Sequence, residues 1–140
     1  MEPAPKLPDE LIRNARLVAD RTVMLDHLPK GGSFVEVGVA LGGYTEKVLE
    51  VVQPESFVAI DLFDLHELPE LWGKPTSEIF GGRTHEEHFR NRFREEIDSG
   101  RMTVVAGDSH EAIRQLPDGF ADIVYVDADH RYEYVAKELE

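Results

Sequence analysis

Four short apolar runs, separated by segments with helical spacing, constrain the fold of this 140-residue chain more than any other feature. The runs cover residues 34–37, 57–60, 102–106 and 123–126, and polar or turn residues bound each of them. Their near-continuous hydrophobicity and their valine, isoleucine and phenylalanine content indicate strands that are buried on both faces. Helical spacing marks residues 44–52, 85–97 and 109–116 and a last segment that begins near Arg131. Alternating strands and helices predict an open, parallel α/β sheet of the Rossmann-like type.

Two further segments lie outside this alternation. Residues 1–32 form an N-terminal helical segment, in which apolar residues recur at helical spacing from Leu11 to Thr22 and Asp9 is the predicted N-cap. Residues 33–140 form the sheet domain, which contains one long connection at 62–84. A connection of this length predicts a lid or a binding loop. Its Trp72 and Phe80 either roof a substrate pocket or anchor the loop on the core, and both interpretations remain open.

The charge of the chain excludes several classes of partner. Fifteen basic and 28 acidic residues give a net charge of −13, which repels phosphate backbones and anionic lipid, so we expect neither a nucleic-acid nor a membrane partner. The absence of cysteine excludes disulfides and thiolate metal sites. The first five residues lack the features of a signal peptide, and no apolar run approaches the roughly 20 residues that span a bilayer. We therefore expect a cytoplasmic protein.

The turns after the first two predicted strands carry glycine and acidic residues. In an open α/β sheet the ligand lies beyond the carboxyl ends of the strands, so these turns form the candidate site. Gly38 permits a tight turn, and Gly42 and Gly43 let backbone amides approach a ligand at the start of a helix. Asp61 ends the second strand, where a carboxylate can accept hydrogen bonds from both ribose hydroxyls of an adenosine-type cofactor.

The third and fourth strands also end in acidic turns. Asp108 and Ser109 follow the third strand, and Asp127, Asp129 and His130 follow the fourth. Taken singly, each has an ordinary explanation, because Asp108, Ser109 or Asp129 can simply cap the helix that follows. Packing alone does not require acid-bearing turns at four successive strand ends, and their conjunction favours a functional site.

The first of these turns resembles a known motif. Glu36-Val37-Gly38, followed after three residues by Gly42-Gly43, resembles the first motif of class I S-adenosylmethionine-dependent methyltransferases. In that family the methionine part of the cofactor lies over the glycine turn. The resemblance then implies that Asp61 binds the ribose and that Asp108 contacts the adenine amine. The cofactor-binding residues that it implies are Glu36, Gly38, Gly42, Gly43, Asp61, Asp108 and Ser109.

The fourth strand extends the resemblance to a narrower group. Asp-Ala-Asp-His-Arg-Tyr at 127–132 is similar to a motif of bacterial small-molecule O-methyltransferases, the group with antibiotic-sugar and cephalosporin-type enzymes. The resemblance implies that Asp127 is a ligand of a divalent metal such as Mg²⁺. It also implies that Asp129 is a general base, with His130 as an alternative base. The implied function is metal-assisted O-methylation of a small molecule.

The complete family fold has seven strands, and this sequence accounts for the first four, in the expected spatial order 3-2-1-4. The resemblance implies that strands five to seven are missing with the rest of the metal site, so we expect the chain alone to be nearly inactive. Its fourth strand would have an open edge, which predicts a homodimer.

Two rival functions are a non-catalytic cofactor-binding or assembly module and an NAD-dependent dehydrogenase. The dehydrogenase fingerprint is not matched, because Ala40 replaces its second glycine.

One motif has no place in this scheme. His85-Glu86-Glu87-His88 puts two imidazoles three residues apart on one helical face, unlike the four-residue spacing of helical zinc sites. A metal site, a lid that touches substrate and a solvated helix face remain as interpretations.

Overall fold

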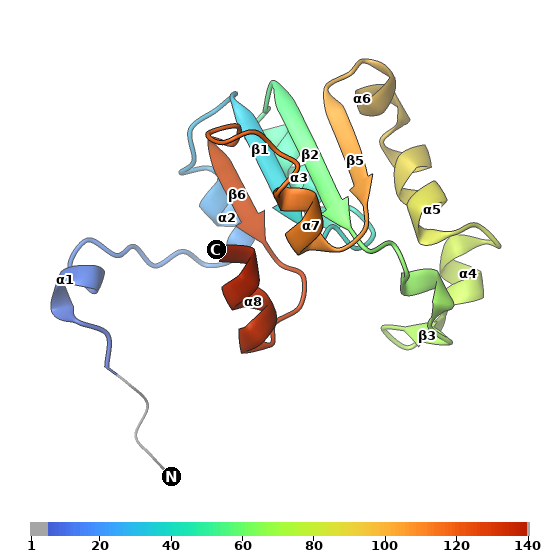
Figure 1. The fold of residues 1–140 in the computed structure, drawn as a ribbon, viewed down its shortest axis with the longest axis horizontal. Helices are drawn as coiled ribbons and strands as arrows, with labels where there is room; N and C mark the ends of the chain where they lie inside the picture. The colour runs from blue at the N-terminus through green and yellow to red at the C-terminus, as the bar shows by residue number, and fades with distance from the viewer. Residues whose placement is uncertain (1–5, 140) are drawn as a thin grey trace, which may run out of the picture.

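The computed structural model describes residues 6–139, so the expectation about a signal peptide at residues 1–5 lies outside the described residues. Its centre is a parallel sheet of β1 (Ser33–Val37), β2 (Ser56–Asp61), β5 (Met102–Ala106) and β6 (Ile123–Val126). The spatial order is β5-β2-β1-β6 (Figure 1), which confirms the predicted order. Val37 pairs with Ile60 on one side and with Val126 on the other, so the carboxyl ends of these strands meet at one edge of the sheet.

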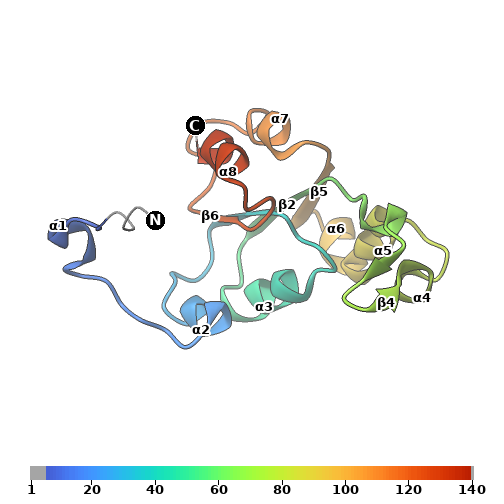
Figure 2. The same cartoon turned by 90° about the horizontal axis from the view of Figure 1, so that it is seen from below.

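Helices cover both faces of the sheet, as the continuous apolar runs predict. Figure 2 shows α2 (Arg21–Leu25) and α3 (Gly43–Val51) on one face, with α7 (Ser109–Ile113) and α8 (Tyr132–Leu139) on the other. Successive strand residues point to opposite faces. Phe34 and Phe57 stack with their ring centroids 5.6 Å apart in the core beside α3, whereas Val35 and Val58 belong to the core beside α7.

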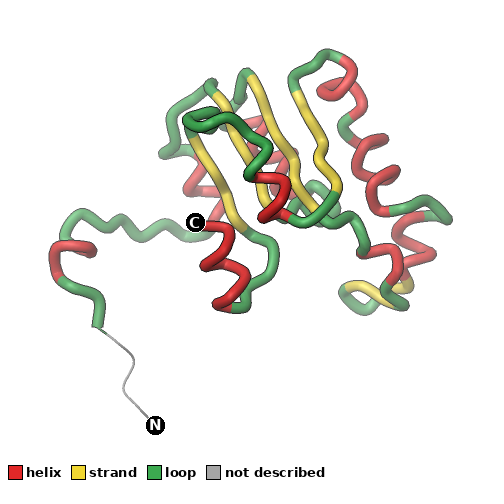
Figure 3. Tube along the Cα trace, in the orientation of Figure 1, coloured by secondary structure: helices red, strands yellow, loops and turns green. Residues whose placement is uncertain are grey.

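The prediction of one amphipathic helix in the N-terminal segment is wrong. The structure has a four-residue α1 (Asp9–Ile12) and a separate α2, and α1 lies away from the sheet (Figures 1 and 3). None of the residues of α1 is buried, so its apolar residues do not stabilise a longer helix by packing on the sheet. Asp20 has an extended backbone, and its carboxylate accepts hydrogen bonds from the amides of Thr22 and Val23, which starts a new helix there.

The long connection at 62–84 is folded. It contains the 3-10 turn η1 (Leu65–Glu67), the short antiparallel strands β3 (Glu70–Leu71) and β4 (Lys74–Pro75), and α4 (Thr76–Phe80). Phe80 is buried and anchors this segment, whereas the Trp72 side chain is 71% exposed. The single helix expected over 85–97 is divided into α5 (His85–Arg92) and α6 (Arg94–Asp98). Within residues 6–139 no helix has the length and apolarity needed to cross a membrane.

Candidate functional site

A cleft of about 750 Å³ lies over the carboxyl ends of the four central strands. Its volume is within the roughly 300–1,000 Å³ range of small-molecule sites. The strand order reverses between β1 and β6, and the turns that follow these two strands both line the cleft. Such a switch point is where open α/β sheets bind ligands. The predicted site residues that line the cleft are Gly38, Asp61, Asp108, Ser109, Asp127, Asp129 and His130.

Asp61 holds the turn that follows β1. Its Oδ2 accepts hydrogen bonds from the backbone amides of Val39, at 2.8 Å, and Ala40, at 3.1 Å. Its Oδ1 accepts from the amide of Phe63 at 2.8 Å. An ionised carboxylate has about four acceptor positions, so Asp61 can accept one further hydrogen bond from the cleft that it lines. No local pattern in the sequence signals these contacts between Asp61 and the turn after β1.

The three predicted glycines differ in whether the structure requires a glycine at their position. Gly38 has φ +85°, and a Cβ added there would lie 2.7 Å from the Cα of Ala128, so this glycine lets the turns after β1 and β6 pack backbone to backbone. Gly42 has φ +82°, and a Cβ there would lie 2.9 Å from Cζ of Phe93. Gly43 has open space around it and begins α3. Gly42 and Gly43 are not among the residues that line the cleft.

Glu36 lies behind the turn and does not line the cleft. Its side chain points to the α3 face of the sheet, where it is 1% exposed and accepts a hydrogen bond from the Thr45 hydroxyl at 2.7 Å. Burial raises the pKa of Glu36 to about 8, although the bond from Thr45 acts in the opposite direction. Glu36 is therefore mostly protonated at neutral pH.

Asp108 and Ser109 line the cleft and form hydrogen bonds with residues of helices α7 and α8. Asp108 caps α7, because its Oδ1 accepts a hydrogen bond from the Glu111 amide at 3.2 Å. The Ser109 hydroxyl donates to Oε1 of Glu138 on α8 at 2.6 Å. Both residues line the cleft, so the capping role that the sequence favoured and a ligand-binding role are compatible.

Asp127 is the centre of an ion-pair cluster. The Arg21 guanidinium, from α2, forms a salt bridge with its Oδ2, and Nε2 of His130 lies 3.1 Å from its Oδ1. Arg21 also donates to the Tyr125 hydroxyl at 3.3 Å. Across residues 6–139 no three acidic or histidine side chains converge as a metal site requires, so the predicted metal site at Asp127 has no support. No local pattern in the sequence signals the contact from Arg21.

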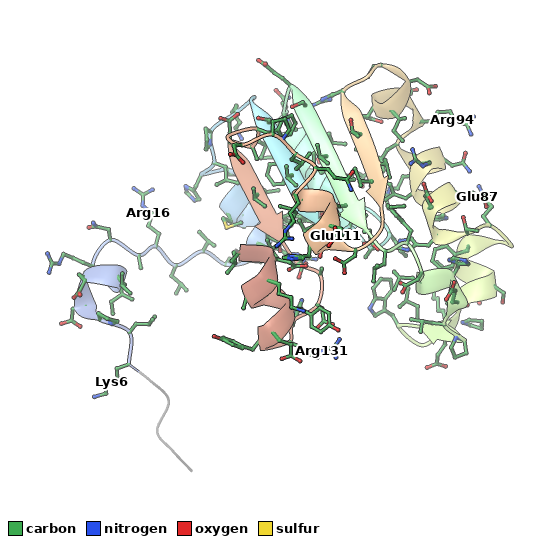
Figure 4. All side chains as sticks on the ribbon, in the orientation of Figure 1. Lys6, Arg16, Glu87, Arg94, Glu111 and Arg131 are labelled. Carbon is green, nitrogen blue, oxygen red and sulfur yellow. The ribbon has the colours of Figure 1, made fainter. Side chains whose placement is uncertain are left out.

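Arg131 controls the charge of Asp129. Its guanidinium donates to both carboxylate oxygens of Asp129, at 2.6 to 3.1 Å, and its backbone amide donates to Oδ1 at 2.9 Å. These hydrogen bonds lower the pKa of Asp129 to about 2, which makes it a weak base. Figure 4 shows Arg131 at the start of α8, at the same end of the sheet as the cleft.

The cleft as a whole is strongly acidic. Six carboxylates line it, and Arg131 is the only lysine or arginine that does so among the described residues. Two of these carboxylates are paired, Asp127 with Arg21 and Asp129 with Arg131, so the other four give the cleft a negative field that favours cations over pyrophosphate groups. The six carboxylates belong to Asp61, Asp64, Asp108, Asp127, Asp129 and Glu138.

The fold is a Rossmann-like open α/β sheet with a cleft at its switch point. A family model described as "Methyltransferase domain" matches residues 35–140, so the chain belongs to this methyltransferase family. The fold is also similar to the crystal structure of precorrin-6y C5,15-methyltransferase from Geobacter metallireducens GS-15, with a TM-score of 0.54 and 12% identity. The match covers 98% of this chain but 65% of that one, so the chain spans about two thirds of that protein. No curated protein sequence matches significantly.

Proposed function

We propose that this chain binds S-adenosylmethionine in the acidic cleft and supports transfer of its methyl group to a small-molecule acceptor. The observation that carries the proposal is a cleft of suitable size, lined by six carboxylates, at the switch point of a methyltransferase-family sheet. The cofactor has a sulfonium and an ammonium group against one carboxylate, so its net charge is opposite to that of the cleft. A nicotinamide dinucleotide has an anionic pyrophosphate, which this field repels. The charge therefore favours the methyltransferase over the dehydrogenase.

The residues of the cleft suit the parts of this cofactor. The remaining acceptor position of Asp61 is available to a ribose hydroxyl, and Asp108 offers an acceptor at the end of β5 for an amine. The small residues Gly38 and Ala40 leave the floor of the cleft free of long side chains. When bound, the cofactor supplies an already activated methyl group, so the protein mainly has to orient the reactants.

A hydroxyl acceptor also has to lose its proton, and we propose His130 as the base. An ionised carboxylate can only accept, so the contact with Asp127 fixes the proton of His130 on Nε2 and leaves Nδ1 free to take a proton. Asp127 then stabilises the imidazolium that forms. Asp129 is less suited to this task because its pKa is held at about 2. This route needs no metal ion.

Calorimetric titration of the full chain with S-adenosylmethionine and with NADH tests the cofactor. We expect the former to bind, and Asp61→Ala to weaken binding by about 1–3 kcal/mol through lost hydrogen bonds to a charged group. Asp118→Ala, at an exposed position outside this cleft, is the matched control and should bind as the wild type does. Binding of NADH alone would establish the dehydrogenase instead.

A methyl-transfer assay against phenols and sugars tests the reaction. We expect His130→Gln to lower the rate by about 10²–10⁴-fold, the usual contribution of a general base, with unchanged cofactor affinity. Full activity of this variant would refute the role of His130. Cofactor binding with no turnover on any acceptor would agree both with the binding-module alternative and with the expectation that the chain alone is nearly inactive, so only measurable turnover excludes the binding module.

A further inference from the structure

The histidine motif at 85–88 is not a solvated helix face. His85 is completely buried, and its Nε2 lies 2.6 Å from the backbone oxygen of Ala40 in the turn after β1. Because a carbonyl oxygen can only accept, the proton is on Nε2, and the buried Nδ1 has no hydrogen-bond partner among the described residues. His88 is half-buried and packs edge-on against Phe80, with ring centroids 5.4 Å apart. Neither histidine lines the cleft.

The same helix contacts this turn at two further points. Nη1 of Arg92, at the end of α5, donates to the backbone oxygen of Leu41 at 2.7 Å. The rings of Phe89 and Phe93 occupy the space beside Gly42, where a side chain would collide with them. Helix α5 therefore holds the carbonyl side of the turn.

Asp61 holds the opposite, amide side of the turn, so both polar groups of Ala40 are fixed. The amide of Ala40 donates to Asp61, and its carbonyl oxygen accepts from His85. Ala40 has φ +46°, which lies in the left-handed region that residues other than glycine rarely adopt. Such a conformation persists only where its surroundings enforce it. Ala40 also lines the cleft, so its conformation shapes the cleft wall.

We infer that His85 is a positioning residue for the cofactor-binding turn. It does not reach the cleft, but its hydrogen bond keeps Ala40 in the left-handed conformation, which sets the backbone that a cofactor would contact. This inference rests on the proposed binding of S-adenosylmethionine in the cleft.

The test combines substitutions at His85 with relief of the backbone strain at Ala40. His85→Phe keeps the ring that packs against Phe63 and Phe80 but removes the donor. We expect it to weaken S-adenosylmethionine binding about tenfold, the effect of losing one buried hydrogen bond. His85→Gln retains an N–H donor and should bind more tightly than His85→Phe. His88→Phe, on the same helix, should bind as the wild type does.

Ala40→Gly separates positioning from a general structural effect. Glycine adopts positive φ at no steric cost, so Ala40→Gly should restore most of the affinity that His85→Phe loses. Gln53 also has a positive φ, of +53°, but follows α3 far from the cleft, so Gln53→Gly should not restore it. Equal rescue by Ala40→Gly and Gln53→Gly, or wild-type affinity in His85→Phe, would overturn the inference.

Two further measurements keep the result decisive. If His85→Phe does not fold, Arg92→Met removes the Leu41 contact at a partly exposed site and should also weaken binding, whereas Arg94→Met on the outer side of α6 (Figure 4) should not. If the wild type itself does not bind the cofactor, the proposed function fails. Amide hydrogen exchange then tests separately whether the hydrogen bond from His85 holds the backbone at Ala40. His85→Phe should accelerate exchange of the Ala40 amide, and unchanged exchange would refute the positioning role of His85.

Discussion

Replacement of Glu36 by glutamine should stabilise the protein at neutral pH and change the pH dependence of its stability. Burial raises the pKa of Glu36 from 4.5 to about 8 in the folded state. Between these values the unfolded chain releases the proton while the folded chain retains it, so stability falls as the pH rises. Each pH unit in this window costs about 1.4 kcal/mol. The cost reaches on the order of 3 kcal/mol at pH 7 and is complete above pH 8.

Glutamine resembles the protonated glutamate in shape and can still accept the hydrogen bond from Thr45, but it does not titrate. Urea unfolding of both proteins at pH 5, 6, 7 and 8 measures the effect. The free energy of unfolding of Glu36→Gln should exceed that of the wild type by an amount that grows with pH across this range. Glu50→Gln, at an exposed position of the same helix as Thr45, should show a constant difference. Parallel curves for Glu36→Gln and the wild type would mean that Glu36 is ionised in the folded protein.

Three further outcomes follow from the described contacts. Gly38→Ala should destabilise the protein by about 3 kcal/mol in urea unfolding, through positive φ and collision with the turn after β6, whereas Gly43→Ala, in open space, should be nearly neutral. With its pKa at about 2, Asp129 is ionised at every pH above 4, so Asp129→Asn should leave the acidic limb of the methyl-transfer pH profile in place. A shifted limb would restore Asp129 as the base. We also propose a homodimer joined along β6, whose only strand partner in the described sheet is β1. Light scattering should show a dimer that tightens as salt screens the charge of −13 and that Val124→Arg disrupts, and a wild-type monomer at tens of micromolar would contradict it.

The strands were predictable because burial on both faces leaves a continuous apolar run, which is a local signal. The observed β5 and β6 coincide with the predicted runs at 102–106 and 123–126, and β1 and β2 extend beyond theirs by one and two residues. Helical periodicity was a weaker guide. In the N-terminal segment the apolar stripe has no described surface to pack on, and the Asp20 cap starts a separate helix, which periodicity does not register.

The site was predictable where a residue follows a strand and unpredictable where a contact crosses the fold. Asp61 and Asp127 line the cleft as expected, since strand ends converge in any parallel sheet. The salt bridge from Arg21 to Asp127 and the bond from His85 to Ala40 join segments that are distant in sequence. The acidic neighbours of His85 made its segment resemble a solvated face, although its own side chain is buried.

The acidity of the cleft bears on how such a protein would release its product. Methyl transfer turns the sulfonium of S-adenosylmethionine into a neutral thioether, so the spent cofactor loses the positive charge that the acidic cleft attracts. The cleft would then bind the reactant more tightly than the product, so each methyl transfer would lower the affinity of the cleft for the cofactor that it holds. Because this preference is electrostatic, it would diminish in concentrated salt, and inhibition by the product would increase with ionic strength.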